Sequence, residues 1–390
     1  MKVLFVTTRC PVPPWRGDQV RAYHHLRLLA PRHAITCCVL AWRSPPAEAL
    51  QAVAALGVRV EAIPLGLGGA VPALARVLRG DRRPLQVLLF ARRRARRRLA
   101  ALVAERFDVV HAQLLRGLAD LAPTAGPLVV DLIDALSANM ARRAAVEGGL
   151  AAPLLAREAA RLVHAEAALV ARGGPCLVVS ARERAALGDP RNVRIVPNGV
   201  DTAAFPYSPD GRPAARLVFA GNLGYFPNVD AAVWLAREVL PRVRAAVPAA
   251  ELRLVGARPA RRVRALARLP GVSLAAAVPA MAPELAAASL AVIPLRAGSG
   301  LQNKVLEALA TGTPVVTTAR ATEGLDVRAG EHLLVADDAA GLADAAIALL
   351  RDPGRAQALA RAGRALVERR YRWEDSAAGV EAAWVAAMQP

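Results

Sequence analysis

Residues 294–316 read PLRAGSGLQNKVLEALATGTPVV, and this stretch decides the fold. An apolar strand pattern ends at Pro294, glycines follow at positions 298 and 300, and a helical pattern starts near Leu301. A second apolar strand begins at Pro314. Short apolar runs joined by a helix are typical of parallel strands that are buried on both faces. The stretch therefore predicts one repeat of an α/β sheet.

The same alternation extends in both directions from this stretch. Strands are expected at Lys2–Thr8, Ala34–Leu40, Val58–Ile63, Asp108–Ala112, Pro127–Asp131 and 176–180, then at Arg216–Ala220, Glu251–Val255, Val272–Ala275, Leu290–Pro294 and Pro314–Thr317. Helices are expected at Gln19–Ala30 with Asp18 as the cap, and at Ala151–Arg172, Val229–Ala246, Pro283–Ser289, Gln302–Thr311 and Ala339–Arg351. These two successive series predict an α/β fold of two Rossmann-like, doubly wound domains that face each other across a cleft.

A segment rich in proline, glycine, asparagine and aspartate separates the two series. It reads IVPNGVDTAAFPYSPDGRP, spans residues 195–213 and has the composition of a linker. A length of 390 residues also favours two domains. We expect an N-terminal Rossmann-like domain at 1–197, a linker at 198–213 and a C-terminal Rossmann-like domain at 214–371. A helix at 372–390 is expected to pack back on the N-terminal domain.

Composition limits the compartment and the class of protein. The most apolar window, LAAASLAVIPL at 285–295, is too short for a membrane span. The N-terminal apolar run is too short for a signal peptide. The four cysteines show no metal-binding or disulfide spacing, and we expect them to be small buried hydrophobes in a reducing compartment. The sequence thus predicts a soluble cytoplasmic protein.

The formal net charge of +19 calls for a physical explanation. An arginine-rich, lysine-poor composition is one explanation, and anionic partners are another. The run ARRRARRRLA at 91–100 first indicates a solvated helix face. Its second interpretation is an anionic membrane surface, which would place the protein on the inner face of the cytoplasmic membrane. Nucleic acid ranks third, because no aromatic residues interleave with the arginines.

Lys304 is, apart from Lys2, the only lysine in the chain. It falls in the first turn of a helix that follows glycines, where backbone N–H groups and the helix dipole favour an anion. A cation there is compensated if a diphosphate binds. Glu307 lies one turn further along and could accept hydrogen bonds from ribose hydroxyls. The plain alternative is a surface Lys–Glu pair.

Polar residues at the ends of N-terminal strands are weaker candidates. Gly17, in the loop after the first strand, could approach phosphates. His111 ends the strand DVVHA, where a parallel sheet exposes side chains to a cleft, and it could contact a reacting sugar. Asp131 and Asp134 end the next strand and could line the same cleft. A structural role for His111 is the alternative interpretation.

Four stretches together resemble the retaining, family-4-like glycosyltransferases of the GT-B fold. They are KVLFVTTRCPVPPWRGDQVRAYHHLRLLA, IVPNGVDTAAF, LVFAGNLGYFPNVDAAVWL and GLQNKVLEALATGTPVVTTARATEGL. Within that group, the pattern is most similar to sugar transferases associated with PEP-CTERM/exosortase exopolysaccharide loci. The motifs GxxxxGK[ST], HExxH and GxSxG are all absent, which argues against three other enzyme classes.

The resemblance implies that the domain at 1–197 lies on the acceptor side and that the domain at 214–371 binds the nucleotide sugar. It also implies roles for named residues. Glu307 would hold the donor ribose, Gly17 would approach the diphosphate and His111 would contact the transferred sugar. Lys304 would act beside the leaving diphosphate. Where the family has the first of two glutamates, this chain has Ser299, so the usual sugar-orienting carboxylate is missing. Further donor contacts are implied at Gly221, Asn222, Ser299, Gly300, Leu301, Gln302 and Asn303.

The leading hypothesis is therefore a hexosyltransferase that needs neither a metal nor another cofactor. It would move a sugar from a nucleotide diphosphate donor to a glycan or polyprenyl-linked acceptor, with retention, in exopolysaccharide biosynthesis. Two alternatives stay open at this point. One is a two-domain sugar-nucleotide epimerase, and the other is a non-catalytic basic binding protein.

Overall fold

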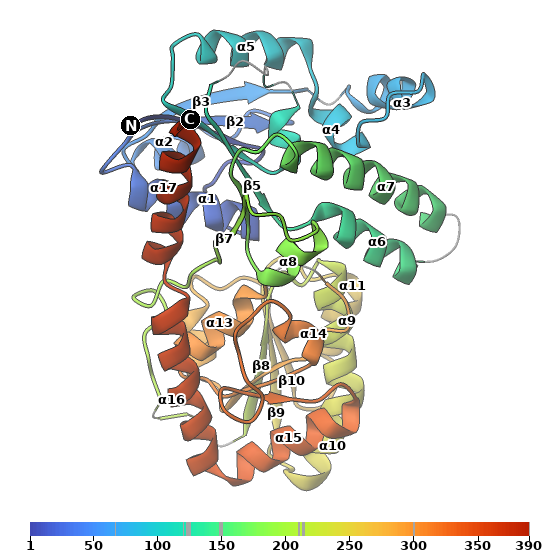
Figure 1. Ribbon diagram of the computed structural model, residues 1–390. Coiled ribbons are helices and arrows are strands. Elements are labelled where there is room, and N and C mark those ends of the chain that lie inside the picture. The colour runs from blue at the N-terminus through green and yellow to red at the C-terminus, as the bar shows by residue number, and fades with distance from the viewer. Residues whose placement is uncertain are drawn as a thin grey trace. The chain divides into compact units, whose positions relative to one another are not determined.

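The computed structural model describes the chain except residues 67, 120, 122–125, 148–150, 210, 213–214, 299–300 and 390. The chain divides into two compact units, one made of Met1–Pro197 with Glu374–Pro390 and the other of Asn198–Trp373. Each unit is built around its own parallel sheet (Figure 1).

The first unit contains a parallel sheet with the order β3-β2-β1-β4-β5-β6-β7. Its central strands are apolar runs with nearly every side chain buried, as expected for a sheet covered by helices on both faces. The strands are β1 Lys2–Thr7, β2 Ala34–Ala41, β3 Arg59–Pro64, β4 Val109–Gln113, β5 Leu128–Ile133, β6 Cys176–Val178 and β7 Val193–Ile195.

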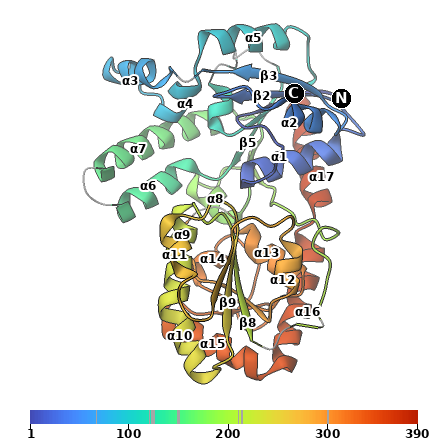
Figure 2. The same cartoon turned by 180° about the vertical axis from the view of Figure 1, so that it is seen from behind.

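The helices of this unit connect successive strands. They are α1 Gly17–Leu29, α2 Ala47–Ala54, α3 Ala70–Leu78, α4 Leu85–Phe90, α5 Arg93–Val103, the 3-10 turn η1 Leu115–Leu118, α6 Leu136–Glu147, α7 Ala151–Val170 and α8 Ala181–Ala186. Helices α6 and α7 lie side by side at one edge of the unit (Figure 1, Figure 2).

The last helix, α17 Trp373–Met388, packs in the first unit although it ends the chain. Ser376 Oγ donates to the carbonyl of Pro197 at 2.7 Å. Trp384 Nε1 donates to Nδ1 of His111 at 3.1 Å. Glu381 pairs with His33 at 2.7 Å. The chain terminus thus completes the core around β1 and β4.

The second unit contains a parallel sheet with the order β10-β9-β8-β11-β12-β13. Its strands are β8 Arg216–Ala220, β9 Glu251–Val255, β10 Val272–Ala275, β11 Leu290–Ile293, β12 Val315–Thr317 and β13 Leu334–Val335. Its helices are α9 Phe226–Trp234, α10 Leu240–Ala246, α11 Arg261–Leu266, α12 Ala282–Ala286, α13 Asn303–Ala310, α14 Ala319–Thr322, α15 Ala339–Arg351 and α16 Pro353–Arg370, with the π-helical turn η2 Leu235–Val239. The two predicted α/β sheets are confirmed.

Two helix predictions needed correction. The helix expected at 229–246 starts at Phe226 and passes through the π-helical turn η2 before Pro241. Proline has no N–H to donate to the preceding turn, so the regular α-helical bonding is broken there. Helix α1 starts at Gly17 with Arg16 as the cap residue, because the carboxylate of Asp18 is held by Arg9.

The segment expected to be a linker packs closely on the second unit in its described parts. Asn198 donates to Oδ1 of Asn303 at 3.3 Å, and the amide of Val200 donates to Tyr371 at 2.8 Å. Arg212 donates to Thr313 Oγ1 at 3.0 Å and to the carbonyl of Ala288 at 2.7 Å. These hydrogen bonds fix the segment's path.

Candidate functional site

The carboxyl ends of β8 and β9 meet at a pair of glycines. Gly221 follows β8 with φ +151°, and Gly256 follows β9 with φ +148°. A Cβ on Gly256 would stand 1.7 Å from the carbonyl oxygen of Gly221. Both the backbone angle and the space therefore demand glycine at 256. In a parallel sheet, this edge is where ligands bind.

Lys304 reaches the same edge from the first turn of α13. Its Nζ donates to Oδ1 of Asn228 and lies 5.1 Å from the ring centroid of Phe219. A Cβ built on Gly221 would be 3.1 Å from this Nζ, so the ammonium lies against the backbone of Gly221. The Nδ2 of Asn228 in turn donates to the carbonyl of Asn222 at 2.9 Å. The lysine is held in place.

The charge of Lys304 has no close counter-ion in the part of the chain that the structure describes. Among the described residues, none of the ion pairs includes its Nζ, and its hydrogen-bond partner Asn228 is neutral. Burial lowers the pKa of Lys304 to about 8, although the nearby charge of Glu307 acts in the opposite direction. An ammonium held by an amide and an aromatic ring is suited to a bound anion.

Glu307 lies on the next turn of α13 and is partly buried. Burial raises the pKa of this carboxyl to about 7, and the charge of Lys304 opposes the rise. No described residue hydrogen-bonds to its carboxylate. The sequence-based alternative of a close Lys304–Glu307 ion pair is thus not what the structure shows. The carboxylate is free to accept hydrogen bonds from a ligand.

The approach to α13 is only partly described. The helix starts at Asn303, and Gln302 before it makes no side-chain capping bond. Asn303 accepts the hydrogen bond from Asn198 already mentioned, and Leu301 and Gln302 are partly buried. The predicted contacts Ser299 and Gly300 lie outside the described residues.

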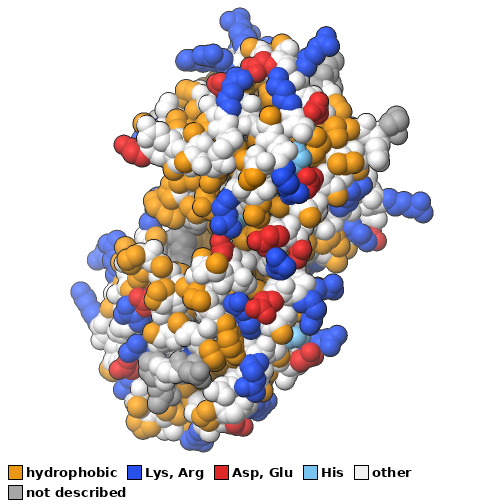
Figure 3. Space-filling view, turned by 90° about the vertical axis from the view of Figure 1, so that its left-hand side faces the viewer, with side chains coloured by type: hydrophobic (Ala, Val, Ile, Leu, Met, Phe, Trp, Pro, Cys, Tyr) orange, Lys and Arg blue, Asp and Glu red, His pale blue; other side chains and the backbone are white. Residues whose placement is uncertain are grey.

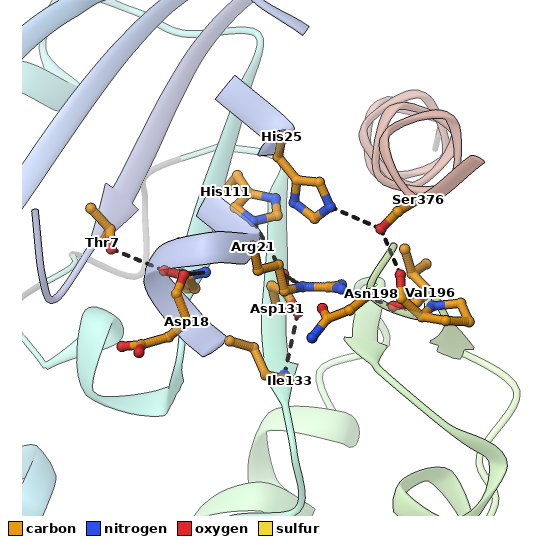
Figure 4. Close-up of polar contacts among 12 residues, drawn as sticks. Thr7, Asp18, Arg21, His25, His111, Asp131, Ile133, Val196, Asn198 and Ser376 are labelled. Atoms are coloured by element: carbon orange, nitrogen blue, oxygen red, sulfur yellow. Dashed lines mark hydrogen bonds and ion pairs between the residues drawn. The ribbon is translucent and has the colours of Figure 1, made fainter. Parts of the chain in front are cut away.

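In the first unit, His111 was expected to be exposed, but the structure buries it. Its side chain is fully buried, stacks on Phe5 with ring centroids 4.4 Å apart, and accepts a hydrogen bond from Trp384. Figure 4 shows it near Arg21 and Asp131. Burial lowers the pKa of His111 to about 4, so the ring is neutral at physiological pH. Exposure was predicted wrongly because the C-terminal helix α17 covers this part of β4.

Asp131 is also buried, contrary to its predicted place at a cleft. Its Oδ2 accepts from Nε of Arg21 at 2.6 Å, and both side chains have no exposed surface. Arg21 donates further to the carbonyl of Val196 at 2.9 Å (Figure 4). A buried carboxylate needs such a partner, and here α1 supplies it.

Asp134 differs from Asp131 because it remains partly exposed after the end of β5. Burial and the charge of Glu183 raise its pKa to about 7. Its Oδ1 has no hydrogen-bond partner in the described part of the chain. That oxygen is buried, so a ligand could contact this side chain only at its exposed part.

The loop after β1 leaves Gly17 exposed, and no atom within 4 Å would block a Cβ there. Nearby, Gln113 at the end of β4 accepts from Thr7 Oγ1 at 2.9 Å and donates to the carbonyl of Asp18 at 2.9 Å. This glutamine ties the loop to the strand ends. Gly17 keeps the open backbone that its predicted role needs.

Sequence reasoning missed Asn228, Gly256, Arg21 and Gln113. Gly256 had a readable signal, because RLVGA repeats the strand-then-glycine pattern of LVFAGN at Gly221. The other three act through partners distant in the chain, and no local pattern marks them. Among the described residues, no three His, Cys, Asp or Glu side chains gather as a metal ion would require.

Comparison with known proteins adds a family match to this geometry. Residues 214–352 match the family described as "Glycosyl transferases group 1". This region contains the site residues from Gly221 to Glu307. No curated protein sequence matches the chain.

Solved structures match over nearly the whole length. Sucrose-phosphate synthase from Thermosynechococcus elongatus is 19% identical, with a TM-score of 0.71 over 99% of this chain and 98% of that chain. HepE from Anabaena, solved in complex with UDP and glucose, is 15% identical, with a TM-score of 0.69 over 99% of this chain and 100% of that chain. WaaG, a glycosyltransferase involved in lipopolysaccharide biosynthesis, is 15% identical, with a TM-score of 0.66 over 99% of both chains.

At these identities, the structural likeness establishes the fold, and the family match lies within the second unit. The chain is thus a two-domain α/β protein of the GT-B fold, and its residues 214–352 are similar to the glycosyl transferases group 1 family.

Proposed function

We propose that the protein transfers a sugar from a nucleotide diphosphate sugar to a glycan or lipid-linked acceptor. The observation that carries this proposal is the position of Lys304 against the backbone of Gly221, with no carboxylate partner among the described residues. A diphosphate would supply the counter-charge that the ammonium lacks. The group 1 match at 214–352 supports the reaction class.

The donor would lie at the carboxyl ends of β8 and β9. Glycine at 221 and 256 lets phosphate oxygens approach the backbone closely. The segment that leads into α13 and the first turn of that helix would direct backbone N–H groups at the same oxygens. Glu307 would accept hydrogen bonds from the ribose hydroxyls. That HepE was solved with UDP and with UDP-glucose supports a donor of this kind.

In the transfer step, the bond between the sugar and the diphosphate breaks, and negative charge grows on the leaving phosphate oxygen. A bond from the sugar to an acceptor hydroxyl oxygen forms, and the hydroxyl proton passes to the leaving diphosphate. Lys304 and the N–H groups of α13 would stabilise this charge. Neither a protein nucleophile nor a metal ion is part of this proposal. We further propose that the sugar is a hexose and that its anomeric configuration is retained. His111 is left out because the fold buries its ring.

Asp134 is our candidate for a contact to the acceptor, because its side chain is partly exposed after the end of β5. The resemblance to transferases of exopolysaccharide loci supports a growing glycan on a polyprenyl carrier as the acceptor. Such an acceptor would place the protein in the cytoplasm, at the inner face of the membrane.

The test incubates the protein with isotope-labelled UDP-glucose, other nucleotide sugars and a polyprenyl-diphosphate-linked sugar. We expect a labelled glycolipid that keeps the donor's anomeric configuration by NMR and still forms in EDTA. Interconversion of the nucleotide sugar without transfer would favour the epimerase. If there is neither reaction nor nucleotide binding, the proposal fails and a non-catalytic basic protein remains. Arg262→Gln, an exposed change on α11, is the matched control for Lys304→Met.

A further inference from the structure

Arginine is concentrated in one part of the first unit. Residues 70–98 contain ten arginines and one acidic residue, Asp81, for a formal charge of +9 out of +19 for the chain. Helix α5 buries Ala95, Leu99 and Leu102 and leaves Arg93, Arg94 and Arg96–Arg98 exposed. Figure 3 shows Lys and Arg side chains projecting at the top of the first unit, where Figure 1 places α5.

A cavity of about 820 Å³ opens between α3 and α5. Six arginines contribute to its lining, with apolar atoms of α4 and of the segment after η1 between them. No acidic side chain is among its described lining residues. The arginines are Arg76, Arg79, Arg83, Arg92, Arg93 and Arg96. Asp81 pairs with Arg76 at 3.1 Å and with Arg83 at 2.8 Å, which offsets part of this charge. The guanidinium groups still outnumber this one carboxylate, and anions such as phosphate groups would relieve the repulsion that remains.

Helix α3 exposes an apolar stripe beside this cavity. Val71, Leu74 and Leu78 are 78%, 53% and 79% exposed. They recur at intervals of three and four residues, which places them on one face of the helix. Ala73 is buried and anchors α3 on the unit. Three large apolar side chains exposed on one short helix call for a partner.

We propose that α3 and α5 together dock the protein on an anionic phospholipid bilayer. The stripe Val71, Leu74 and Leu78 would enter the boundary between headgroups and acyl chains. The arginine-lined cavity would hold lipid phosphates, and the outer arginines of α5 would lie over the charged surface. Charge complementarity selects this partner: an apolar face bordered by ten arginines and one aspartate matches a surface that is anionic outside and apolar beneath.

The proposed docking surface binds at the membrane interface and does not span the bilayer. In the described part of the chain, no helix has both the length and the hydrophobicity to cross a bilayer. The inference deepens the membrane placement made under the proposed function and rests on it for its biological purpose. Its physical basis, however, is independent of the donor site, which lies in the other unit.

The experiment is co-sedimentation with vesicles of phosphatidylcholine alone or with 30 mol% phosphatidylglycerol, at about 0.1 M salt. We expect binding to the anionic vesicles, little to the neutral ones, and weakening at higher salt. Each basic residue near the surface contributes roughly a fivefold change in partitioning. Changing Arg93, Arg94, Arg97 and Arg98 to Gln should therefore weaken binding by at least about 50-fold. Changing Val71, Leu74 and Leu78 to Ser should weaken it by about 10-fold or more.

The matched control changes Arg261, Arg262, Arg264 and Arg268 to Gln, which removes the same charge from exposed positions on the second unit. It should bind vesicles nearly as the parent does. An equal loss of vesicle binding in the control and in the α5 variant would show that only net charge matters, and would overturn the proposed docking surface. A parent dimer that the α3 serine variant abolishes, without loss of vesicle binding, would assign the stripe to a second copy.

Two further readouts separate this inference from other causes. A fluorophore on Leu74→Cys should shift to the blue with anionic vesicles, and the parent treated with the same reagent should not. Binding of a single-stranded RNA as tight as that of vesicles, lost in the α5 variant and kept in the α3 variant, would favour nucleic acid instead. UDP binding by every variant, measured by calorimetry, keeps failure of the dock distinct from failure of the donor site.

Discussion

Replacing Lys304 by Met should stabilise the fold or leave it unchanged, and should at the same time weaken donor binding. The lysine is partly buried and has no carboxylate partner among the described residues, so the folded protein carries an electrostatic penalty that Met removes. A bound diphosphate uses the same charge. A residue kept only for structure would affect stability and binding in the same direction.

The size of the stability effect follows from the pKa. Burial shifts the pKa of Lys304 from 10.5 to about 8, which corresponds to a penalty of about 3 kcal/mol when the amine is charged. Met also leaves Oδ1 of buried Asn228 without its donor, which costs about 1–3 kcal/mol. The net change at pH 7 is therefore about 0–2 kcal/mol in favour of Met.

The pH dependence of stability tests independently whether the charge of Lys304 destabilises the fold. Because the folded-state pKa of Lys304 lies below the unfolded value, the penalty is full below pH 8 and disappears as the pH rises towards 10.5. In urea unfolding at pH 7, 8, 9 and 10, the free energy of unfolding of the parent should rise relative to that of the Met variant. A difference that does not change with pH would contradict the assigned cause.

The binding effect is the loss of one charge-assisted hydrogen bond to phosphate, about 1.5–3 kcal/mol, or roughly 10- to 150-fold in the Kd for UDP. Turnover should fall further, because the leaving charge grows during transfer. Lys304→Arg should be impaired less than Met but still impaired, since Gly221, Asn228 and Phe219 leave a narrow space. Normal UDP affinity and turnover in both variants would refute the reasoning.

Three further predictions concern Glu307, His111 and Gly256. Burial raises the pKa of Glu307 from 4.5 to about 7, so the parent loses stability as the pH rises through that window. Glu307→Gln should not lose it, and its free energy of unfolding should rise relative to the parent's by up to about 3 kcal/mol above pH 7. The same variant should bind UDP at least roughly tenfold more weakly and lose the rise in affinity near pH 7, and unchanged affinity in calorimetry would remove Glu307 from the site. His111→Ala should lower stability by about 2–4 kcal/mol in thermal melting and leave turnover per folded molecule unchanged. Loss of turnover without loss of stability would instead indicate that His111 contacts the sugar. Gly256→Ala should abolish UDP binding before it unfolds the protein, because its Cβ would strike Gly221, and near-normal binding in a folded variant would contradict that placement.

The strand positions were readable because each buried strand is a short apolar run bounded by polar or turn residues. Arg216–Ala220, Glu251–Val255 and Val272–Ala275 have the predicted bounds. Lys304 and Glu307 were also readable as residues of one helix that follows a strand and glycines. Local patterning carries this information, since sheet topology follows from the order of strands and helices.

Burial of side chains at strand ends was not readable. His111 and Asp131 were expected to be exposed because both lie near the carboxyl ends of strands. One is covered by Trp384, 273 residues later in the chain, and the other is paired with Arg21, 110 residues earlier. Contacts at such separation leave no periodic pattern in the sequence, so a strand end alone does not predict whether its side chain meets solvent.

The central claim is that Lys304 is the residue that contacts the donor diphosphate. The chain contains only two lysines, Lys2 and Lys304, so this claim can be tested directly. Protein labelled with ¹³C at lysine Cε should give two resonances, one of which disappears in Lys304→Met. In the free protein, the Lys304 resonance should titrate near pH 8, as burial dictates. With saturating UDP, the titration midpoint should rise by about 1 unit or more, because an adjacent diphosphate favours the charged amine. Unchanged Lys304 titration with UDP demonstrably bound would contradict the account.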